Sequence, residues 1–340
     1  MDVNLEIMRG ISLRKCLRNV RNLWWASPLD LPEKIRSNLW KKSASVSGFD
    51  VFLSHTWQSS GLRKCLALLL QSTWMWGLAF WLFILLLLMI IYMQNLLPTP
   101  SGYSLPQRYG GGTVPQGPWM AIFSLPSCLF GLALAVYLPE RIWQSPTCFL
   151  DAVSIHQTDQ GLMKQGVYGL GGFLKASKEL RILWSAPYFS RLWCIFELAA
   201  YRTANPTGKI TLAPVFVESA VAAYFVASYL ACVSFTLDRQ SFLFLSLVGQ
   251  MVSTYILIWY LRRNLSVKRK LISDLQNFDI AQAQCRLQYD RDFVLDAITD
   301  WFGSQEAFTD YVRGNLGKAA TSGLLPLTVE LGWLLPVLGL

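Results

Sequence analysis

The sequence has few charged side chains and few that could bind a metal. Aspartate, glutamate, lysine and arginine make up 15% of its 340 residues, against about 25% in an average globular protein. Only two histidines are present, and none of the seven cysteines has a CxxC or CxxH spacing. We therefore expect no metal site, and free thiols in a reducing compartment are the simplest interpretation of the cysteines.

A signal peptide and a nucleic-acid-binding pattern are also missing. The first 30 residues carry five basic side chains but no continuous apolar core of the kind a signal peptide needs. The net charge of +9 is not interleaved with stacking aromatic residues, so we expect no nucleic acid partner. Leu5–Trp25 predicts either a basic amphipathic helix lying on anionic lipid or a solvated arm.

Charge is scarce because the hydrophobic share reaches 53% and is concentrated in blocks. A block of about 18 or more apolar residues is typical of a transmembrane helix. Four blocks are predicted to cross a bilayer: Thr73–Met93, Trp119–Leu138, Ser219–Leu237 and Ser241–Leu261. A buried helical core is the alternative for the last two.

Basic residues are distributed unevenly between these blocks. The loop Gln94–Pro118 has only Arg108, whereas eight basic residues lie between the second and third blocks. Because cytosolic loops are enriched in lysine and arginine, the N-terminus, the middle and the C-terminal region are all predicted to be cytosolic. We therefore expect an integral, multi-pass membrane protein with the lipid bilayer as a partner, in a membrane that the sequence does not specify.

Strand and helix patterns alternate outside the apolar blocks. Four strands are predicted: Phe49–Leu53, Cys148–Ile155, Leu180–Trp184 and Ile210–Val217. Helical patterns at Gly166–Ser177 and Ser190–Tyr201 lie between them, and two more helices, Asp290–Phe302 and Ser304–Leu316, are joined at Gly303. This order predicts an α/β fold with a parallel sheet and helices on both faces.

The predicted organisation splits the α/β domain with membrane hairpins. The expected segments are a basic cytosolic segment (1–48), the first part of the α/β domain (49–72), a first hairpin (73–138, with spans 73–93 and 119–138), the second part of the domain (139–217), a second hairpin (218–261, with spans 219–237 and 241–261), a cytosolic helical region (262–323) and an apolar C-terminal segment (324–340). The last segment is either a fifth span or an interfacial segment.

Three runs of the α/β domain resemble the TIR (Toll/interleukin receptor) domain family. The first strand of that family reads roughly Y/F-D-V-F-L/I-S, and Phe49–Ser54 reads FDVFLS. The family block S-x-x-Y/F-x-x-S-x-W-C-x-x-E-L is similar to Ser185–Leu198, with Ser190 offset by one, and Pro214–Phe216 is similar to the next strand. The resemblance implies a flavodoxin-like fold, which here would be interrupted by the membrane hairpins.

The resemblance also implies a chemistry. Some TIR domains cleave the nicotinamide–ribose bond of NAD, and their essential carboxylate is the glutamate that corresponds to Glu197. Breaking this bond builds positive charge on the ribose, which a carboxylate stabilises best where water is excluded. Glu197 is thus the predicted catalytic residue, with NAD as a substrate and no resident cofactor. A structural carboxylate paired with a nearby lysine or arginine is the alternative.

The residues predicted to bind the substrate surround the ends of the predicted strands. They are Ser54, His55, Trp57, Asp151, Ser185, Tyr188 and Trp193. The tryptophans would stack on the nicotinamide or adenine ring, or else pack in the core. His55 is either a proton donor or a hydrogen-bonded loop anchor, and Asp151 orients the cleft or caps a turn.

Three functions remain open at this point. The chain is a membrane-anchored NAD hydrolase acting in signalling, a non-catalytic scaffold that self-associates or binds other TIR domains, or a transporter or channel regulated by its TIR-like domain. The third is disfavoured because the four apolar blocks contain no aspartate, glutamate, lysine, arginine or histidine. Small residues between Ser219 and Ala231 favour close helix packing or a homo-oligomer.

Overall fold

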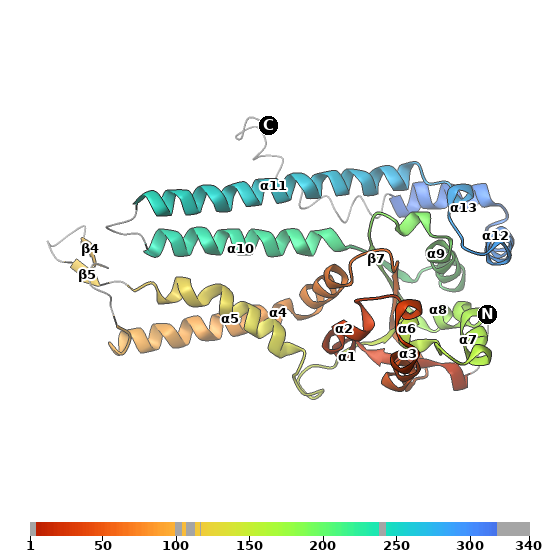
Figure 1. Ribbon diagram of the computed structural model, residues 1–340, viewed down its shortest axis with the longest axis horizontal. Helices are drawn as coiled ribbons and strands as arrows, with labels where there is room; N and C mark the ends of the chain where they lie inside the picture. Colours follow the sequence, from red (N-terminus) through yellow and green to blue (C-terminus); the bar gives the residue numbers. More distant parts are fainter. Residues whose placement is uncertain (1–4, 99–103, 107–112, 116, 238–242, 318–340) are drawn as a thin grey trace. The chain divides into compact units, whose positions relative to one another are not determined.

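The computed structural model describes residues 5–98, 104–106, 113–115, 117–237 and 243–317. The chain forms two compact units. The sheet unit comprises the described parts of Met1–Lys64, Ser145–Val215 and Ser266–Leu340, and the helix unit comprises those of Cys65–Gln144 and Phe216–Leu265. Each unit is therefore built from segments that are far apart in the sequence (Figure 1). The expected C-terminal segment 324–340 lies outside the described residues.

A six-stranded mixed sheet forms the centre of the sheet unit, with the order β2-β1-β6-β3-β7-β8. Its strands are β1 (Arg9–Ser12), β2 (Ala44–Ser45), β3 (Phe49–His55), β6 (Thr147–Phe149), β7 (Ser177–Trp184) and β8 (Lys209–Pro214). Strands β6, β3, β7 and β8 are parallel, whereas β1 is antiparallel to both of its neighbours. The structure is compatible with the predicted α/β fold, and the four predicted strands form the parallel part of a sheet that is mixed where a parallel one was expected. The second of them is shorter than expected because a helix begins at Asp151.

Strand β3 joins the separated segments. Val51 pairs with Cys148 on one side and with Glu179 on the other. Six of its seven residues are buried, as expected for a central parallel strand covered on both faces. Phe52 stacks on Phe149 at 4.3 Å between ring centroids, and Phe173 lies 5.2 Å from Phe149. The residues before the first apolar helix and those after the second therefore share one core.

Short helices surround the sheet. They are η1 (Leu5–Ile7), α1 (Leu13–Arg18), α2 (Val20–Leu23), η2 (Pro28–Asp30), α3 (Glu33–Leu39), η3 (Trp40–Lys42), α6 (Asp151–Ser154), α7 (Gln160–Tyr168), α8 (Leu170–Lys175), η4 (Tyr188–Ser190), α9 (Leu192–Ala204), η5 (Ile280–Gln282), α12 (Gln288–Phe302), α13 (Gln305–Tyr311) and the π-helix η6 (Val312–Leu316). The two predicted C-terminal helices are confirmed, since Gly303 ends α12 with φ 82° and the Ser304 side chain caps α13.

Two helix expectations need correction. The helix expected at Gly166–Ser177 is divided into α7 and α8 at Gly169, and Ser177 already belongs to β7. The helix expected at Ser190–Tyr201 begins only at Leu192, and the Ser190 hydroxyl donates to the Pro187 carbonyl. The first helix therefore ends before its predicted last residue, and the second begins after its predicted first residue.

The N-terminal segment is neither a helix lying on lipid nor a solvated arm. Strands β1 and β2 extend the sheet, and Cys16, Leu23 and Trp24 are buried against it. The apolar side chains that suggested an amphipathic helix instead face the protein core. A strand as short as β1 has no detectable hydrophobic period in the sequence. It forms because its backbone pairs with that of β6.

The helix unit contains α5 (Trp119–Ala135), most of α4 (Gly61–Met93), α10 (Val215–Leu237) and α11 (Leu243–Gln276), and a small hairpin of β4 (Ser104–Pro106) and β5 (Thr113–Pro115). Among the described residues, two helices are long and apolar enough to cross a membrane: Gly61–Met93 and Val215–Ser234. The expectation of four spans is thus supported for the first and third. The second expected span corresponds to the 17-residue α5, and the fourth begins outside the described residues and continues into α11.

Helices α4 and α5 approach closely at two glycines. A Cβ added to Gly131 would lie 2.6 Å from the Phe80 Cβ, and one added to Gly77 would lie 2.9 Å from Leu132. Gln71 of α4 also donates to Glu218 of α10, and the Tyr229 hydroxyl of α10 donates to the Ile122 carbonyl at 2.8 Å. Glu218 lies just outside the expected third span, but it belongs to α10, which is one of the two long apolar helices.

Candidate functional site

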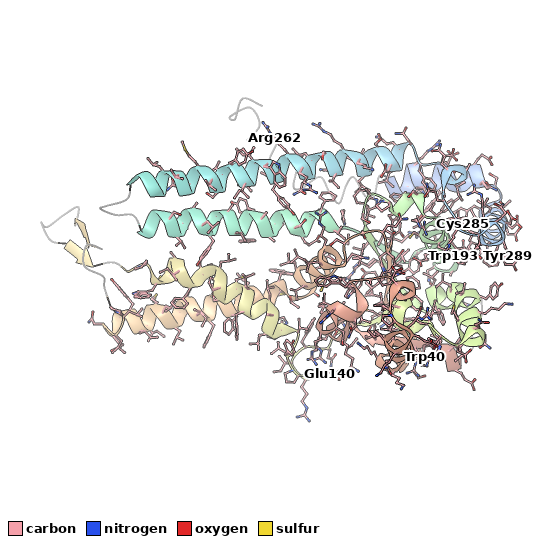
Figure 2. The ribbon with its side chains drawn as sticks, in the orientation of Figure 1. Trp40, Glu140, Trp193, Arg262, Cys285 and Tyr289 are labelled. Carbon is pink, nitrogen blue, oxygen red and sulfur yellow. The ribbon has the colours of Figure 1, made fainter. Side chains whose placement is uncertain are left out.

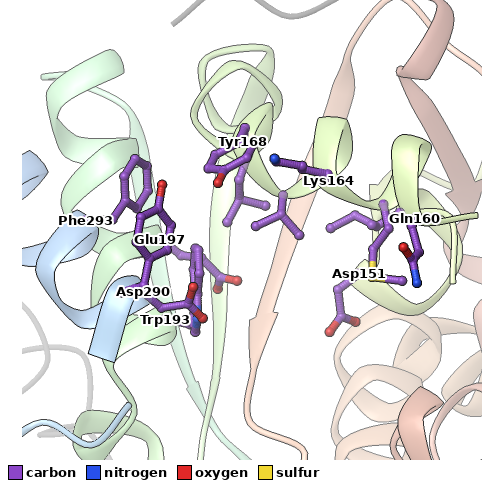
Figure 3. A pocket seen from close by; sticks show the side chains of 13 residues that line it. Asp151, Gln160, Lys164, Tyr168, Trp193, Glu197, Asp290 and Phe293 are labelled. Atoms are coloured by element: carbon purple, nitrogen blue, oxygen red, sulfur yellow. The ribbon is translucent and has the colours of Figure 1, made fainter. Parts of the chain in front are cut away.

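The sheet unit has a cleft of about 440 Å³ between α7, α9 and α12 (Figure 3). Its lining consists of Asp151, Ile155, Gln160, Met163, Lys164, Val167, Tyr168, Leu170, Trp193, Glu197, Tyr289, Asp290 and Phe293. Asp151 directly follows β6, and Glu197 lies on α9, which follows β7. The cleft is thus at the carboxyl ends of parallel strands, where open α/β sheets bind ligands, and its volume is typical of a small-molecule site.

Glu197 is held by a buried hydroxyl network. The Ser54 hydroxyl, from the end of β3, donates to Glu197 Oε2. The Tyr188 hydroxyl lies 2.6 Å from Ser54 Oγ, a pair in which either hydroxyl can donate, and it also donates to the Cys194 carbonyl at 3.3 Å. Two residues predicted to bind substrate therefore lie behind Glu197 and orient it.

The environment of Glu197 raises its pKa. Burial raises the pKa of the Glu197 carboxyl from 4.5 to about 8, the hydrogen bond from Ser54 opposes this shift, and the nearby charge of Asp151 adds to it. No lysine or arginine in the described part of the chain is within ion-pair distance of Glu197. The geometry therefore does not support the alternative of a structural ion pair, and the carboxyl is poised to change its charge near neutral pH.

Asp151 and Trp193 line the cleft as expected. One Asp151 oxygen accepts the Trp57 indole N–H at 2.7 Å, and the other accepts the Ala152 amide at 2.7 Å. Trp57 therefore orients Asp151 and does not itself line the cleft. The half-buried Trp193 lies beside Tyr289 of α12 (Figure 2) and meets the edge of Phe196 at 5.5 Å.

His55 and Ser185 are not among the residues that line the cleft. The His55 ring is buried between Trp24 and Trp57, at 5.5 and 4.7 Å between ring centroids. Burial, with a contribution from the Lys64 charge, lowers the pKa of His55 to about 4. The ring is thus neutral at physiological pH, which does not favour a role as proton donor. The Ser185 hydroxyl is buried and has no hydrogen-bond partner among the residues the structure describes.

Several lining residues come from a helix that the sequence did not connect with the site. These residues, Tyr289, Asp290 and Phe293, belong to α12, which follows the apolar helices α10 and α11. Phe196 of α9 packs against Phe293 at 5.9 Å and against Trp301 at 5.5 Å, which fixes α12 beside the cleft. The helical pattern of α12 was visible in the sequence, but nothing in it indicated which surface the helix would cover.

Acidification should destabilise the sheet unit through His55. Because its pKa falls from 6.5 in the unfolded chain to about 4 in the fold, the unfolded state binds more protons between these values. Stability is therefore complete above pH 6.5 and is lost as the pH falls to about 4, by about 3 kcal/mol at roughly 1.4 kcal/mol per pKa unit. Thermal unfolding in detergent should show a smaller acid loss in His55→Phe than in the wild type. His156→Gln, which removes the only other histidine, should keep the full loss, and equal acid sensitivity of all three proteins would contradict this assignment.

The described residues contain no group of three or more histidine, cysteine, aspartate or glutamate side chains that could hold a metal ion. No family model matches the chain, and neither the curated proteins nor the solved structures contain a match. The chemistry of the site must therefore be inferred from its geometry.

Proposed function

We propose that the sheet unit is a cytosolic TIR-like domain, anchored by membrane-spanning helices, which cleaves the nicotinamide–ribose bond of NAD and acts in signalling. The order of the parallel strands supports this proposal. In chain order β6, β3, β7 and β8 are the second, first, third and fourth parallel strands, which is the order of flavodoxin-like folds. The FDVFLS run forms β3, and the run containing Glu197 forms α9 beside it.

The pairing of the strands supports a topology with four spans. Strand β3 precedes α4, and its partners β6 and β7 follow α5, so both segments must lie on the same side of a membrane. If α4 crosses the bilayer, α5 must return through it. The same reasoning applies to α10 and α11, because α12 contributes to the cleft after both. The basic residues that flank these helices favour the cytosolic side for the sheet unit.

The observation that carries the catalytic proposal is the position of Glu197 in the cleft, hydrogen-bonded by Ser54 and close to Asp151 and Trp193. Departure of nicotinamide leaves positive charge on the ribose, which an ionised Glu197 would stabilise. The Trp193 ring offers a face for the nicotinamide, and Asp151 has the acceptor oxygens to orient ribose hydroxyls. Water then completes the hydrolysis.

Release of nicotinamide from NAD by the full chain in detergent tests this function. We expect turnover in the wild type and a loss of about 10³-fold in Glu197→Gln, which keeps the shape of the side chain but cannot become charged. Glu306→Gln, which changes an exposed glutamate on α13, should be unaffected. Equal rates in the wild type and Glu197→Gln, or no turnover in either, would rule out the enzyme.

A non-catalytic scaffold is the second candidate. Several large apolar side chains of the sheet unit are exposed, among them Ile35 at 39% and Leu287 at 58%, and such side chains could contact another TIR-like domain or a second copy of the chain. Self-association with no nicotinamide release at any protein density would favour this function over hydrolysis.

A further inference from the structure

Lys64, in the first turn of α4, is the most unusual buried charge of the sheet unit. Its side chain is 0% exposed, whereas that of the preceding residue, Arg63, is exposed. Its Nζ donates to the Thr56 carbonyl at 2.9 Å, and no carboxylate within the described residues forms an ion pair with it. Burying an ammonium group costs several kcal/mol unless other contacts compensate for the lost water.

Two indole rings supply part of that compensation, and the nearby charge of Asp151 also favours the ammonium form. Lys64 Nζ lies 5.0 Å from the ring centroid of Trp57 and 5.9 Å from that of Trp24, both within the range of a cation–π interaction. His55 contacts the same two rings. Trp57 is therefore held by a cation and an imidazole together, although it lies in a loop between β3 and α4.

The orientation of Trp57 matters to the cleft because its indole N–H donates to Asp151 Oδ2 at 2.7 Å. Asp151 is the lining residue that follows β6, and its Oδ1 accepts one hydrogen bond from the Ala152 amide. A continuous series of contacts thus leads from the first turn of α4, through Lys64 and Trp57, to a carboxylate in the cleft.

We propose that Lys64 and Trp57 are positioning residues that hold the Asp151 carboxylate in the cleft, so that the first turn of α4 sets the affinity of the cleft for its ligand. This goes beyond the proposed hydrolysis, because it applies to any ligand that contacts Asp151. Because α4 is one of the two helices long and apolar enough to span a membrane, the same contacts link a membrane helix to the site. The competing explanation is that Lys64 stabilises only the Thr56 backbone, to which it donates, and has no effect on the Trp57 ring.

The first test needs no ligand. In the full chain with ¹⁵N-labelled tryptophan in detergent, the Trp57 indole signal is identified by its loss in Trp57→Phe. We expect its hydrogen exchange to be at least about tenfold faster in Lys64→Met than in the wild type, because a looser indole opens its hydrogen bond more often. Arg63→Met removes an exposed charge from the same turn and should leave the rate unchanged. An unchanged rate in Lys64→Met would overturn the proposal.

The second test uses NAD and depends on the proposed function. Trp57→Phe keeps the ring for Lys64 and His55 but removes the N–H, so we expect its Kd for NAD to rise about tenfold, the usual effect of losing one charge-assisted hydrogen bond. In an Asp151→Asn background the same change should have little further effect, since Trp57 acts through Asp151. Trp25→Phe, at an exposed tryptophan, is the control.

The two tests separate the two proposals. If Trp57→Phe weakens NAD binding as much in the Asp151→Asn background as in the wild type, positioning through Asp151 is wrong. If the wild type does not bind NAD, the proposed function fails, and the exchange of the Trp57 indole still decides whether Lys64 positions it.

Discussion

The rate of nicotinamide release at low NAD concentration should rise about tenfold per pH unit from about pH 6 and level off above about pH 8. The reason is the raised pKa of Glu197, which burial moves to about 8. Only the ionised carboxylate stabilises the charge that develops on the ribose, so the rate follows the ionised fraction of the free enzyme. A pH series of kcat/KM between these limits measures it directly.

Two variants should move this profile in opposite directions. Ser54→Ala removes the hydrogen bond that lowers the Glu197 pKa, so the midpoint should shift to higher pH. Asp151→Asn removes a negative charge that raises the pKa, so the midpoint of its remaining activity should shift to lower pH. A flat profile over this range, or a shift of Ser54→Ala towards acid, would show that Glu197 is not the group that titrates.

Phe149→Ala should destabilise the sheet unit by about 3–5 kcal/mol, as large-to-small changes of buried aromatic residues do. Phe149 is 1% exposed, stacks on Phe52 and packs against Phe173. It is also the residue through which the segment after the first two apolar helices meets the segment before them. Thermal unfolding and limited proteolysis of the purified chain measure the loss.

Two further substitutions make this prediction specific. Phe149→Leu, which keeps most of the buried volume, should cost clearly less than Phe149→Ala. Phe123→Ala, at a phenylalanine of α5 that is 43% exposed, should not loosen the sheet unit. If Phe149→Ala left its proteolytic stability unchanged, the two segments would not share the core that the strand pairing indicates.

Much of the fold was predictable because it depends on local pattern. The run Phe49–Leu53 predicts a buried strand and becomes the central strand β3. Gly303 predicts the break between α12 and α13, and its positive φ explains why glycine is needed there. Two of the four apolar blocks correspond to helices long enough to span a membrane.

The site was predictable only in part. Glu197, Asp151 and Trp193 lie together in one cleft, as expected from the sequence. Trp57 and His55 were expected to bind the substrate, yet neither is among the residues that line the cleft, and the Trp57 indole donates to Asp151. Which of two neighbouring side chains reaches the cleft depends on the direction of a loop, and residue type does not encode that direction.

Composition, apolar runs and strand periods therefore establish an α/β domain divided by long apolar helices and a short set of candidate residues. Only the folded chain shows three other features: strand β1, the side of the cleft that α12 forms, and the burial of Lys64. The physical reason is the separation of contacting residues along the sequence. Periodicity reflects contacts within a few residues, whereas pairings such as Val51 with Cys148 join segments that are separated by two apolar helices.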